Sequence, residues 1–251
     1  MDSVDVVIRA DWNEAVGSGH AMRCNAIAQE VEQLGGSVLF VVSSEESAEN
    51  LASIGRSGFV LPADCLHLEA DEGFALGDLC HEVHAKSILV DTYGITDGFF
   101  GGLRCSPGHD VPITWIDDLY TYELGECARP VWRDVDQVID YSFGVSISDY
   151  EAVYADGKTK ICIAPAYAPV RPQFCDDGNG DRDFIKRILV TSGSTNERSL
   201  LERAALACLK AFPDVQVDVV VGALASFDAP SDDRVVTHRG LTDLSSLMRD
   251  A

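Results

Sequence analysis

The stretch VGSGHAMRC (16–24) follows the apolar run VDVVIRA (4–10) and opens a segment with helical periodicity. In HAMRCNAIAQEVEQLGG (20–36), apolar residues recur on one helical face until two glycines end the pattern. A second apolar run, SVLFVV (37–42), comes directly after it. This order predicts a strand-helix-strand unit whose first strand and helix are joined by a glycine-framed turn.

The same alternation continues along the chain. Further strands are expected at 87–91, 112–118, 137–140, 186–192, 217–222 and 234–238. Helices are expected at about 45–54, 73–84, 96–104 and 197–211, with another beginning near Asp243. Nearly continuous apolarity is typical of strands buried on both faces of a parallel sheet. We therefore predict an α/β fold with two doubly wound, Rossmann-like domains.

A change of composition separates the two domains. We predict an N-terminal domain at 1–153, which carries the GSGH motif, and a linker or crossover at 154–185 containing APAYAPVRPQF and the acidic, glycine-rich CDDGNGDRD. The remainder, 186–251, is predicted to be a partial nucleotide-binding domain. Its three expected strands make a small core for an open α/β domain, so we expect this domain to be truncated.

Charge and cysteine usage limit the partners and the compartment. The chain of 251 residues has 19 basic and 41 acidic side chains, a formal net charge of -22, which repels nucleic acids and anionic membranes. Its eight cysteines form no CxxC pair, so no structural zinc site is expected. No apolar run approaches the roughly 18 residues of a membrane span. We expect a reduced, cytoplasmic protein, and no pattern indicates its oligomeric state.

The glycine-framed turn resembles an anion site. Gly17 and Gly19 allow a tight turn with positive φ and close approach by a ligand, while the helix that follows presents unpaired N–H groups. Met22 stands where a dinucleotide fingerprint needs its third glycine, and no Gly-Lys-Ser/Thr of a phosphate loop follows. We therefore expect no nicotinamide or other cofactor.

His20 is the leading catalytic candidate. The positive end of a helix dipole disfavours a protonated imidazole, and the carboxyl end of the first strand is where open α/β sheets bind ligands. His20 is thus placed to act as a general base toward water or a hydroxyl, or alternatively it caps the turn. Arg23 would meet a phosphate or an acidic partner, or lie in solvent. Asp11 would orient His20 or cap the turn.

Polar residues at the ends of other strands are further candidates. Tyr93 in VDTYG and Asp118 in WIDDL follow predicted strands, with turn formation as the alternative. In the second domain, TSGSTNE (191–197) repeats the arrangement of strand, small-residue turn and helix. Gly193, Ser194 and Thr195 would hold a nucleotide phosphate there, or one of the hydroxyls would be a helix N-cap.

The string RADWNEAVGSGHAMRCNAIA (9–28) closely resembles the opening of the PseG/SpsG family, in which RAD is followed by GxGHxxR. These are the nucleotide-sugar hydrolases of pseudaminic acid biosynthesis and their spore-coat polysaccharide relatives. VDTYG, IDDL, AYAPVRPQF and ILVTSGSTN occur in the family's order. The resemblance implies two domains like those of GT-B glycosyltransferases. It also implies metal-independent hydrolysis of UDP-2,4-diacetamido-2,4,6-trideoxy-β-L-altropyranose to UDP and free sugar.

The resemblance also implies roles for individual residues. His20 matches the family's catalytic histidine, and Arg23 and Asp11 would support it and the phosphate region. Tyr93 would lie near the sugar. Tyr167 and Arg171 belong to the crossover segment near the substrate.

Two alternatives to a hydrolase remain open. One is a glycosyltransferase of the same architecture, in which an acceptor hydroxyl replaces water. The other is a truncated remnant that binds a nucleotide sugar without turnover.

Overall fold

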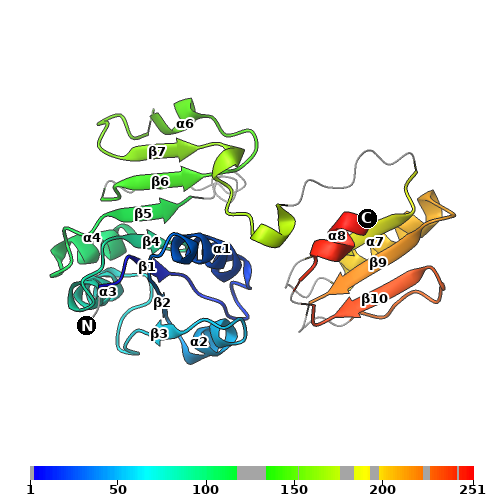
Figure 1. The fold of residues 1–251 in the computed structure, drawn as a ribbon, viewed down its shortest axis with the longest axis horizontal. Coiled ribbons are helices and arrows are strands. Elements are labelled where there is room, and N and C mark those ends of the chain that lie inside the picture. Colours follow the sequence, from blue (N-terminus) through cyan, green and yellow to red (C-terminus); the bar gives the residue numbers. More distant parts are fainter. Residues whose placement is uncertain are drawn as a thin grey trace. The chain divides into compact units, whose positions relative to one another are not determined.

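The structure, a computed structural model, describes residues 3–117, 134–151, 153–175, 184–192, 198–222, 227–241 and 243–251. The chain divides into two compact units, Met1–Val170 and Arg171–Ala251. Each unit contains its own parallel sheet (Figure 1). The boundary between the units lies within 154–185, the segment that the sequence indicates as a linker.

The first unit is built on a parallel sheet of seven strands in the order β3-β2-β1-β4-β5-β6-β7. These strands are β1 (Val6–Arg9), β2 (Val38–Val42), β3 (Gly58–Val60), β4 (Ile88–Val90), β5 (Ile113–Ile116), β6 (Gln137–Asp140) and β7 (Lys160–Ile163). The neighbours β1 and β4 are in parallel register, with Val7 opposite Ile88. The strand order reverses between them, and open α/β sheets bind ligands at the carboxyl ends of such a pair.

Helices cover both faces of this sheet. They are α1 (Gly19–Gln33), α2 (Glu45–Ala52), α3 (Ala70–Glu82), α4 (Asp97–Cys105) and α6 (Ile147–Glu151). Ile8 of β1 belongs to the core formed with α1 and α2, whereas its neighbour Val7 belongs to the core formed with α3 and α4. Successive strand residues point to opposite faces. Because both faces are buried, the strands are apolar almost throughout, as their sequences indicate.

The ends of α1 follow from local residue chemistry. Gly17, just before the helix, has a φ of 70°, which glycine adopts at little cost. At the other end Gly35 has a φ of 83°, and its N–H donates to the Glu32 carbonyl at 2.9 Å. The next N–H, of Gly36, donates to the Val31 carbonyl at 2.8 Å. This pair of bonds is a Schellman ending and explains why the helix stops at the two glycines.

Helices α3 and α4 approach each other through glycines. A Cβ added at Gly73 would lie 1.9 Å from the Phe99 carbonyl oxygen, and one at Gly102 would lie 2.0 Å from the Ala70 carbonyl oxygen. Both distances are far below van der Waals contact with backbone atoms that cannot rotate away. The two helices therefore pack at this separation only with glycine at both positions.

The second unit has a three-stranded parallel sheet in the order β10-β9-β8. Its elements are β8 (Arg187–Thr191), α7 (Arg198–Ala211), β9 (Gln216–Val221), β10 (Val235–Arg239) and α8 (Ser245–Asp250). Val217 and Val219 of β9 pack in a core with Leu201 of α7. Asp218 points to the other face, where it pairs with Arg187 at 2.9 Å and with His238 at 2.8 Å.

The strands and helices expected from the apolar pattern are confirmed, with their ends shifted by a few residues. The structure adds β3, α6 and β7. β7 extends the sheet of the first unit into the segment indicated as a linker, and its first residue, Lys160, is exposed. None of the helices in the described part of the chain is long and apolar enough to cross a membrane.

Candidate functional site

His20 and Asp91 meet where the strand order reverses. His20 is the second residue of α1, the helix that follows β1, and Asp91 directly follows β4. His20 Nδ1 lies 2.7 Å from Asp91 Oδ1, and the two side chains are 4% and 0% exposed. A carboxylate at this distance favours the tautomer in which Nδ1–H donates to it, so Nε2 carries the lone pair. In that tautomer Nε2 can accept a proton, and Nδ1 also lies 3.0 Å from Arg23 Nη2.

Arg23 holds the carboxylate in place. Its Nε and Nη2 donate to the two oxygens of Asp91, and its Nη1 donates to the Tyr141 hydroxyl at 2.7 Å. Burial alone raises the pKa of Asp91, but the hydrogen bonds from Arg23 and His20 outweigh it and bring the pKa below its ordinary 3.8. Burial likewise lowers the pKa of Arg23, and the bond to Asp91 more than reverses this. Both groups are therefore charged, and the fork geometry fixes the orientation of Asp91.

Tyr93 and Cys24 complete the immediate surroundings. The rings of Tyr93 and His20 pack edge to face with centroids 4.4 Å apart, and Tyr93 is 39% exposed. Tyr93 therefore lies between the imidazole and solvent on one side. Cys24 Sγ donates to Asp91 Oδ2 at 3.4 Å. Burial and the neighbouring carboxylate raise the pKa of this thiol well above its usual range, so it stays protonated and donates.

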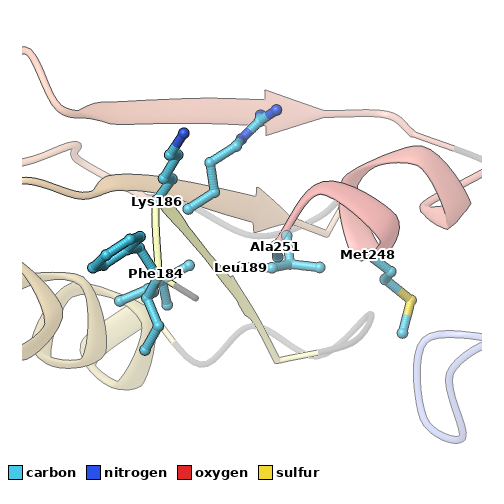
Figure 2. Close-up of a pocket in the computed structure, with 8 residues that line it drawn as sticks. Phe184, Lys186, Leu189, Met248 and Ala251 are labelled. Carbon is cyan, nitrogen blue, oxygen red and sulfur yellow. The ribbon is translucent and has the colours of Figure 1, made fainter. Parts of the chain in front are cut away.

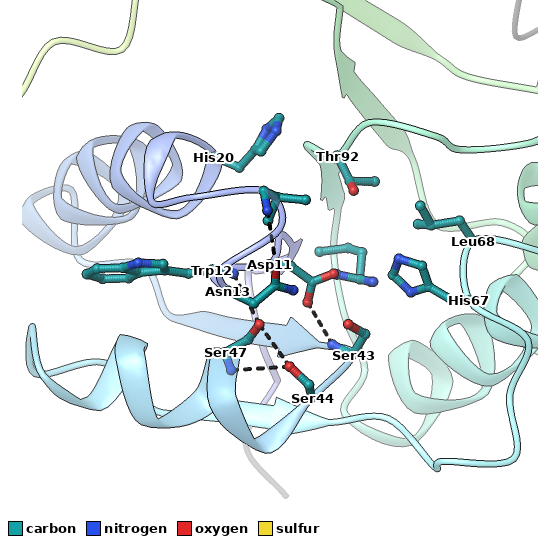
Figure 3. Close-up of polar contacts among 12 residues, drawn as sticks. Asp11, Trp12, Asn13, His20, Ser43, Ser44, Ser47, His67, Leu68 and Thr92 are labelled. Carbon is teal, nitrogen blue, oxygen red and sulfur yellow. Dashed lines mark hydrogen bonds and ion pairs between the residues drawn. The ribbon is translucent and has the colours of Figure 1, made fainter. Parts of the chain in front are cut away.

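Asp11 does not bind His20, which was one of the two roles expected from sequence. Its Oδ1 accepts a hydrogen bond from the Ser43 backbone N–H at 2.8 Å (Figure 3), and its Oδ2 pairs with Arg9 Nη1 at 2.9 Å. Burial raises the pKa of Asp11, but Arg9 and Ser43 outweigh this effect and lower it. Asp11 thus links β1 to the segment after β2, and Asp91 is the carboxylate that orients His20.

The two glycines of GSGH differ in their roles. Gly17 adopts the left-handed conformation that the turn requires, whereas Gly19 is the first residue of α1 and has no positive φ. A Cβ at Gly19 would meet no protein atom within 4 Å. The expectation of positive φ therefore holds only for Gly17. Open space beside Gly19 is compatible with the close ligand approach that the sequence predicts.

More polar side chains gather at the same edge of the sheet. Ser43 follows β2, Thr92 follows β4 and His67 precedes α3, so these residues lie in loops at the carboxyl ends of the strands. In Figure 3 the imidazole of His20 points away from Asp11 and Ser43. Ser44 accepts from the Ser47 N–H and caps α2. Within the described ranges, no group of three His, Cys, Asp or Glu side chains is arranged to hold a metal ion.

Of the remaining predicted residues, the structure describes Tyr167 and Arg171. Tyr167 ends the 3-10 turn η1 (Pro165–Tyr167) and is 50% exposed. Arg171 caps the next turn, η2 (Pro172–Phe174), with its guanidinium 4.7 Å from the Phe174 ring centroid. Their proposed contacts with substrate stay predictions. Four further candidates, Asp118, Gly193, Ser194 and Thr195, lie outside the described residues.

A cavity of about 470 Å³ lies in the second unit (Figure 2). Its lining includes Phe184, Lys186, Leu189, Met248 and Ala251. Phe184 and Lys186 precede β8, so the cavity adjoins the amino end of that strand. Ligands of open α/β sheets bind at the carboxyl ends, where the predicted phosphate turn follows β8. We therefore do not assign this cavity to the site.

The His20 cluster comprises His20, Arg23, Cys24, Asp91, Tyr93 and Tyr141. Three of these residues were not singled out from sequence: Cys24, within the predicted helix, Asp91 and Tyr141. Asp91 lies in VDTYG, directly after a predicted strand, and Tyr141 directly follows the strand 137–140. Both therefore carried the same signal as Tyr93, a polar side chain at the carboxyl end of an apolar run. Nothing in the sequence showed that these strand ends meet α1.

No family model matches the chain, and no curated protein does. Solved structures do match. MurG of Acinetobacter baumannii is 13% identical with a TM-score of 0.58, and the match covers 99% of this chain and 71% of that one. UGT2 of Phytolacca americana, complexed with UDP-2-fluoro-glucose and pterostilbene, is 12% identical with a TM-score of 0.57, over 100% of this chain and 74% of that one.

A glycosyltransferase from Rickettsia africae ESF-5 is 10% identical with a TM-score of 0.56, over 100% of this chain and 72% of that one. At such identities the likeness is one of fold alone. It agrees with the parallel sheets of the two units, the first of which has the doubly wound strand order. The chain therefore has the α/β fold of GT-B glycosyltransferases.

Proposed function

We propose that this protein is an enzyme that acts on a nucleotide sugar, with His20 as the general base that activates an attacking hydroxyl. The observation that carries the proposal is the buried pair of His20 and Asp91 at the strand-order reversal of the first unit. A base oriented by an ionised carboxylate is the arrangement that activates hydroxyl nucleophiles in many enzymes.

The chemistry follows from the contacts of the pair. Nε2 of His20 takes the proton of the hydroxyl as its oxygen forms a bond to the anomeric carbon of the sugar. The bond from that carbon to the phosphate oxygen breaks, and the nucleoside diphosphate leaves with the bonding electrons. Asp91 accepts a hydrogen bond from Nδ1–H of His20 and stabilises the imidazolium that forms. Arg23 keeps Asp91 ionised and oriented. The imidazolium then returns its proton to solvent.

Transfer to an acceptor hydroxyl is the reaction that we favour. UGT2, in complex with UDP-2-fluoro-glucose and pterostilbene, has a similar fold. So do two glycosyltransferases, from Rickettsia africae and Streptomyces nogalater. We propose a UDP-sugar as the donor. Gly193, Ser194 and Thr195 are proposed to hold its phosphates, as the turn after the strand 186–192 suggests.

Hydrolysis is the second candidate. It is supported by the string 9–28, which resembles the opening of the PseG/SpsG hydrolases, including His20 and Arg23 at matching positions. In this reaction water takes the place of the acceptor, and the substrate would be a UDP-activated diacetamido-trideoxy sugar. The same base serves both reactions, so the His20 cluster does not distinguish them.

The test is a proton NMR time course of the purified chain with UDP-glucose, UDP-N-acetylglucosamine and the diacetamido-trideoxy altropyranose nucleotide. Each donor is offered with and without a mixture of hydroxyl acceptors, beside a His20→Ala variant. Transfer is established if UDP is released only in the presence of an acceptor and a new glycoside forms. UDP and free sugar without an acceptor establish hydrolysis. UDP binding with no turnover by wild type contradicts both and supports a binding role.

A further inference from the structure

We propose that Tyr93 screens the imidazole of His20 from water, so that a bound acceptor, and not solvent, reaches the base. This rests on the proposed function and deepens it, because it concerns which hydroxyl reacts. A general base must come within about 3 Å of the group whose proton it takes. His20 is 4% exposed, so its imidazole is almost closed to solvent, and an acceptor gains access to it when a neighbouring side chain moves.

Two neighbours of the imidazole are held in place. Among the described residues, Asp91 and Arg23 contact its Nδ1, at 2.7 and 3.0 Å. Asp91 is fully buried, and Arg23 donates to both oxygens of Asp91 and to the Tyr141 hydroxyl. Moving either side chain would break a buried ion pair, which is costly. These two residues therefore fix the Nδ1 side of the ring.

Tyr93 contacts the same ring in a different way. Its ring packs edge to face with the imidazole, with the centroids 4.4 Å apart and an angle of 77° between the planes. Tyr93 is 39% exposed, whereas the side chains of Arg23 and Asp91 are 17% and 0% exposed. An aromatic contact of this kind is weaker than a buried ion pair. Among the described contacts of the imidazole, the contact with Tyr93 is thus the one that opens toward solvent at least cost.

The backbone on both sides of Tyr93 is anchored. Before it, the Asp91 N–H donates to the Arg9 carbonyl at 3.0 Å. After it, Ile95 is 6% exposed and packs in the core with α3 and α4. Gly94, between Tyr93 and Ile95, has a φ of 78°, which glycine adopts at little cost. Opening is therefore a rotation of the Tyr93 side chain rather than a movement of the whole loop.

A ring in this place favours transfer over hydrolysis. Water has no binding energy with which to turn the Tyr93 ring, whereas an acceptor that packs against the ring has. A closed site also protects an activated sugar from attack by solvent. The base is the same in both reactions, and access to it discriminates between them.

The first test measures access to His20 without any substrate. Diethyl pyrocarbonate transfers an ethoxycarbonyl group to an imidazole nitrogen that carries a lone pair, and mass spectrometry of peptides gives a modification rate for each histidine. Wild type is compared with Tyr93→Ala, Tyr93→Phe and Phe74→Ala at one pH. Phe74 is a matched control because it is 46% exposed and lies on α3, which covers the face of the sheet opposite to α1. His109, which is 55% exposed, is the reference within each protein.

We expect Tyr93→Ala to raise the modification rate of His20 by about tenfold, the change in opening that corresponds to the loss of one edge-to-face contact. The rate at His109 should not change. Tyr93→Phe keeps the ring, and Phe74→Ala leaves it in place, so in both variants His20 should react as it does in wild type. Equal rates at His20 in wild type and Tyr93→Ala would overturn the proposal, and so would equal rates at His20 and His109 in wild type. A rise that Tyr93→Phe shares would contradict screening by the ring.

The second test measures the partition between the two reactions. Each donor named above is offered with a mixture of hydroxyl acceptors, and we expect Tyr93→Ala to form more free sugar per glycoside than wild type. An unchanged ratio, or free sugar as the main product of wild type, would overturn the discrimination against water. If wild type turns over none of the donors, the proposed reaction and its link to Tyr93 fail together. The modification rates then still decide whether Tyr93 screens His20.

Discussion

Nδ1 of His20 lies 2.7 Å from Oδ1 of Asp91, although 71 positions separate the two residues in the sequence. The contact exists because β1 and β4 are adjacent and parallel, so that the helix after one and the residue after the other meet at the same edge. Both side chains are buried, which strengthens the interaction by excluding water.

Replacing His20 with alanine should lower kcat by about 10²-fold or more, because general bases typically contribute that much. UDP release measured with the active donor checks this, and circular dichroism checks that the variant is folded. His109→Ala, an exposed histidine at the amino end of β5, should retain wild-type kcat. Equal rates for wild type and His20→Ala would show that His20 is not the base.

Asp91→Asn should also lower kcat by about 10²-fold or more, since an amide donor at this place favours the wrong tautomer of His20. KM should change much less, because Asp91 is fully buried and is not expected to contact substrate. Steady-state kinetics of wild type and variant provide the measurement. A rise in KM with unchanged kcat would instead indicate that Asp91 serves binding.

Asp91→Asn should destabilise the protein by about 2–4 kcal/mol at neutral pH, because it leaves the charge of Arg23 without its carboxylate. The pKa of Asp91 in the folded state is below its ordinary 3.8, so its stabilisation is fully present above that value and is lost as pH falls through the folded-state pKa. The difference between the urea midpoints of wild type and variant should therefore be constant above about pH 5 and shrink below about pH 4. A difference that grows on acidification would contradict the assignment.

Arg23→Lys should lower kcat by about tenfold, because an ammonium cannot reproduce the fork that joins both oxygens of Asp91 to the Tyr141 hydroxyl. Tyr141→Phe removes only one of these bonds and should have a smaller effect. Arg104→Lys is the control, since Arg104 binds backbone carbonyls before β5 and β6. A kcat for Arg23→Lys equal to that of Arg104→Lys would rule out a positioning role.

Gly73→Ala should destabilise the protein by about 1–3 kcal/mol, the usual cost of overpacking, because the added methyl would lie 1.9 Å from the Phe99 carbonyl oxygen. Gly101→Ala is the control. It lies in α4 with nothing within 4 Å of the added Cβ, and should stabilise by about 0.5–1 kcal/mol. Urea denaturation of both variants tests the pair, and similar midpoints would show that α3 and α4 can separate without cost.

Much of the fold follows from local patterns. The run VLFVV predicted β2 because a strand buried on both faces is apolar throughout. The spacing of apolar residues after GSGH predicted α1 because a helix buried along one stripe repeats them at that spacing. In β3 the central residue, Phe59, is exposed, and β7 begins with an exposed lysine, so neither strand shows a run of buried apolar residues. Gly73 and Gly102 look like helix-weakening residues, and only the approach of α3 and α4 explains them.

The candidate site, too, could be predicted only in part from the sequence. The sequence by itself determined the strand-turn-helix unit around GSGH, and with it the place of His20 at the start of α1, because turn and helix signals act over a few residues. Only the tertiary structure decided that Asp91 rather than Asp11 binds the imidazole. This choice depends on which strands are neighbours. The neighbours are set by burial and hydrogen bonding between segments distant in sequence, for which no local pattern exists.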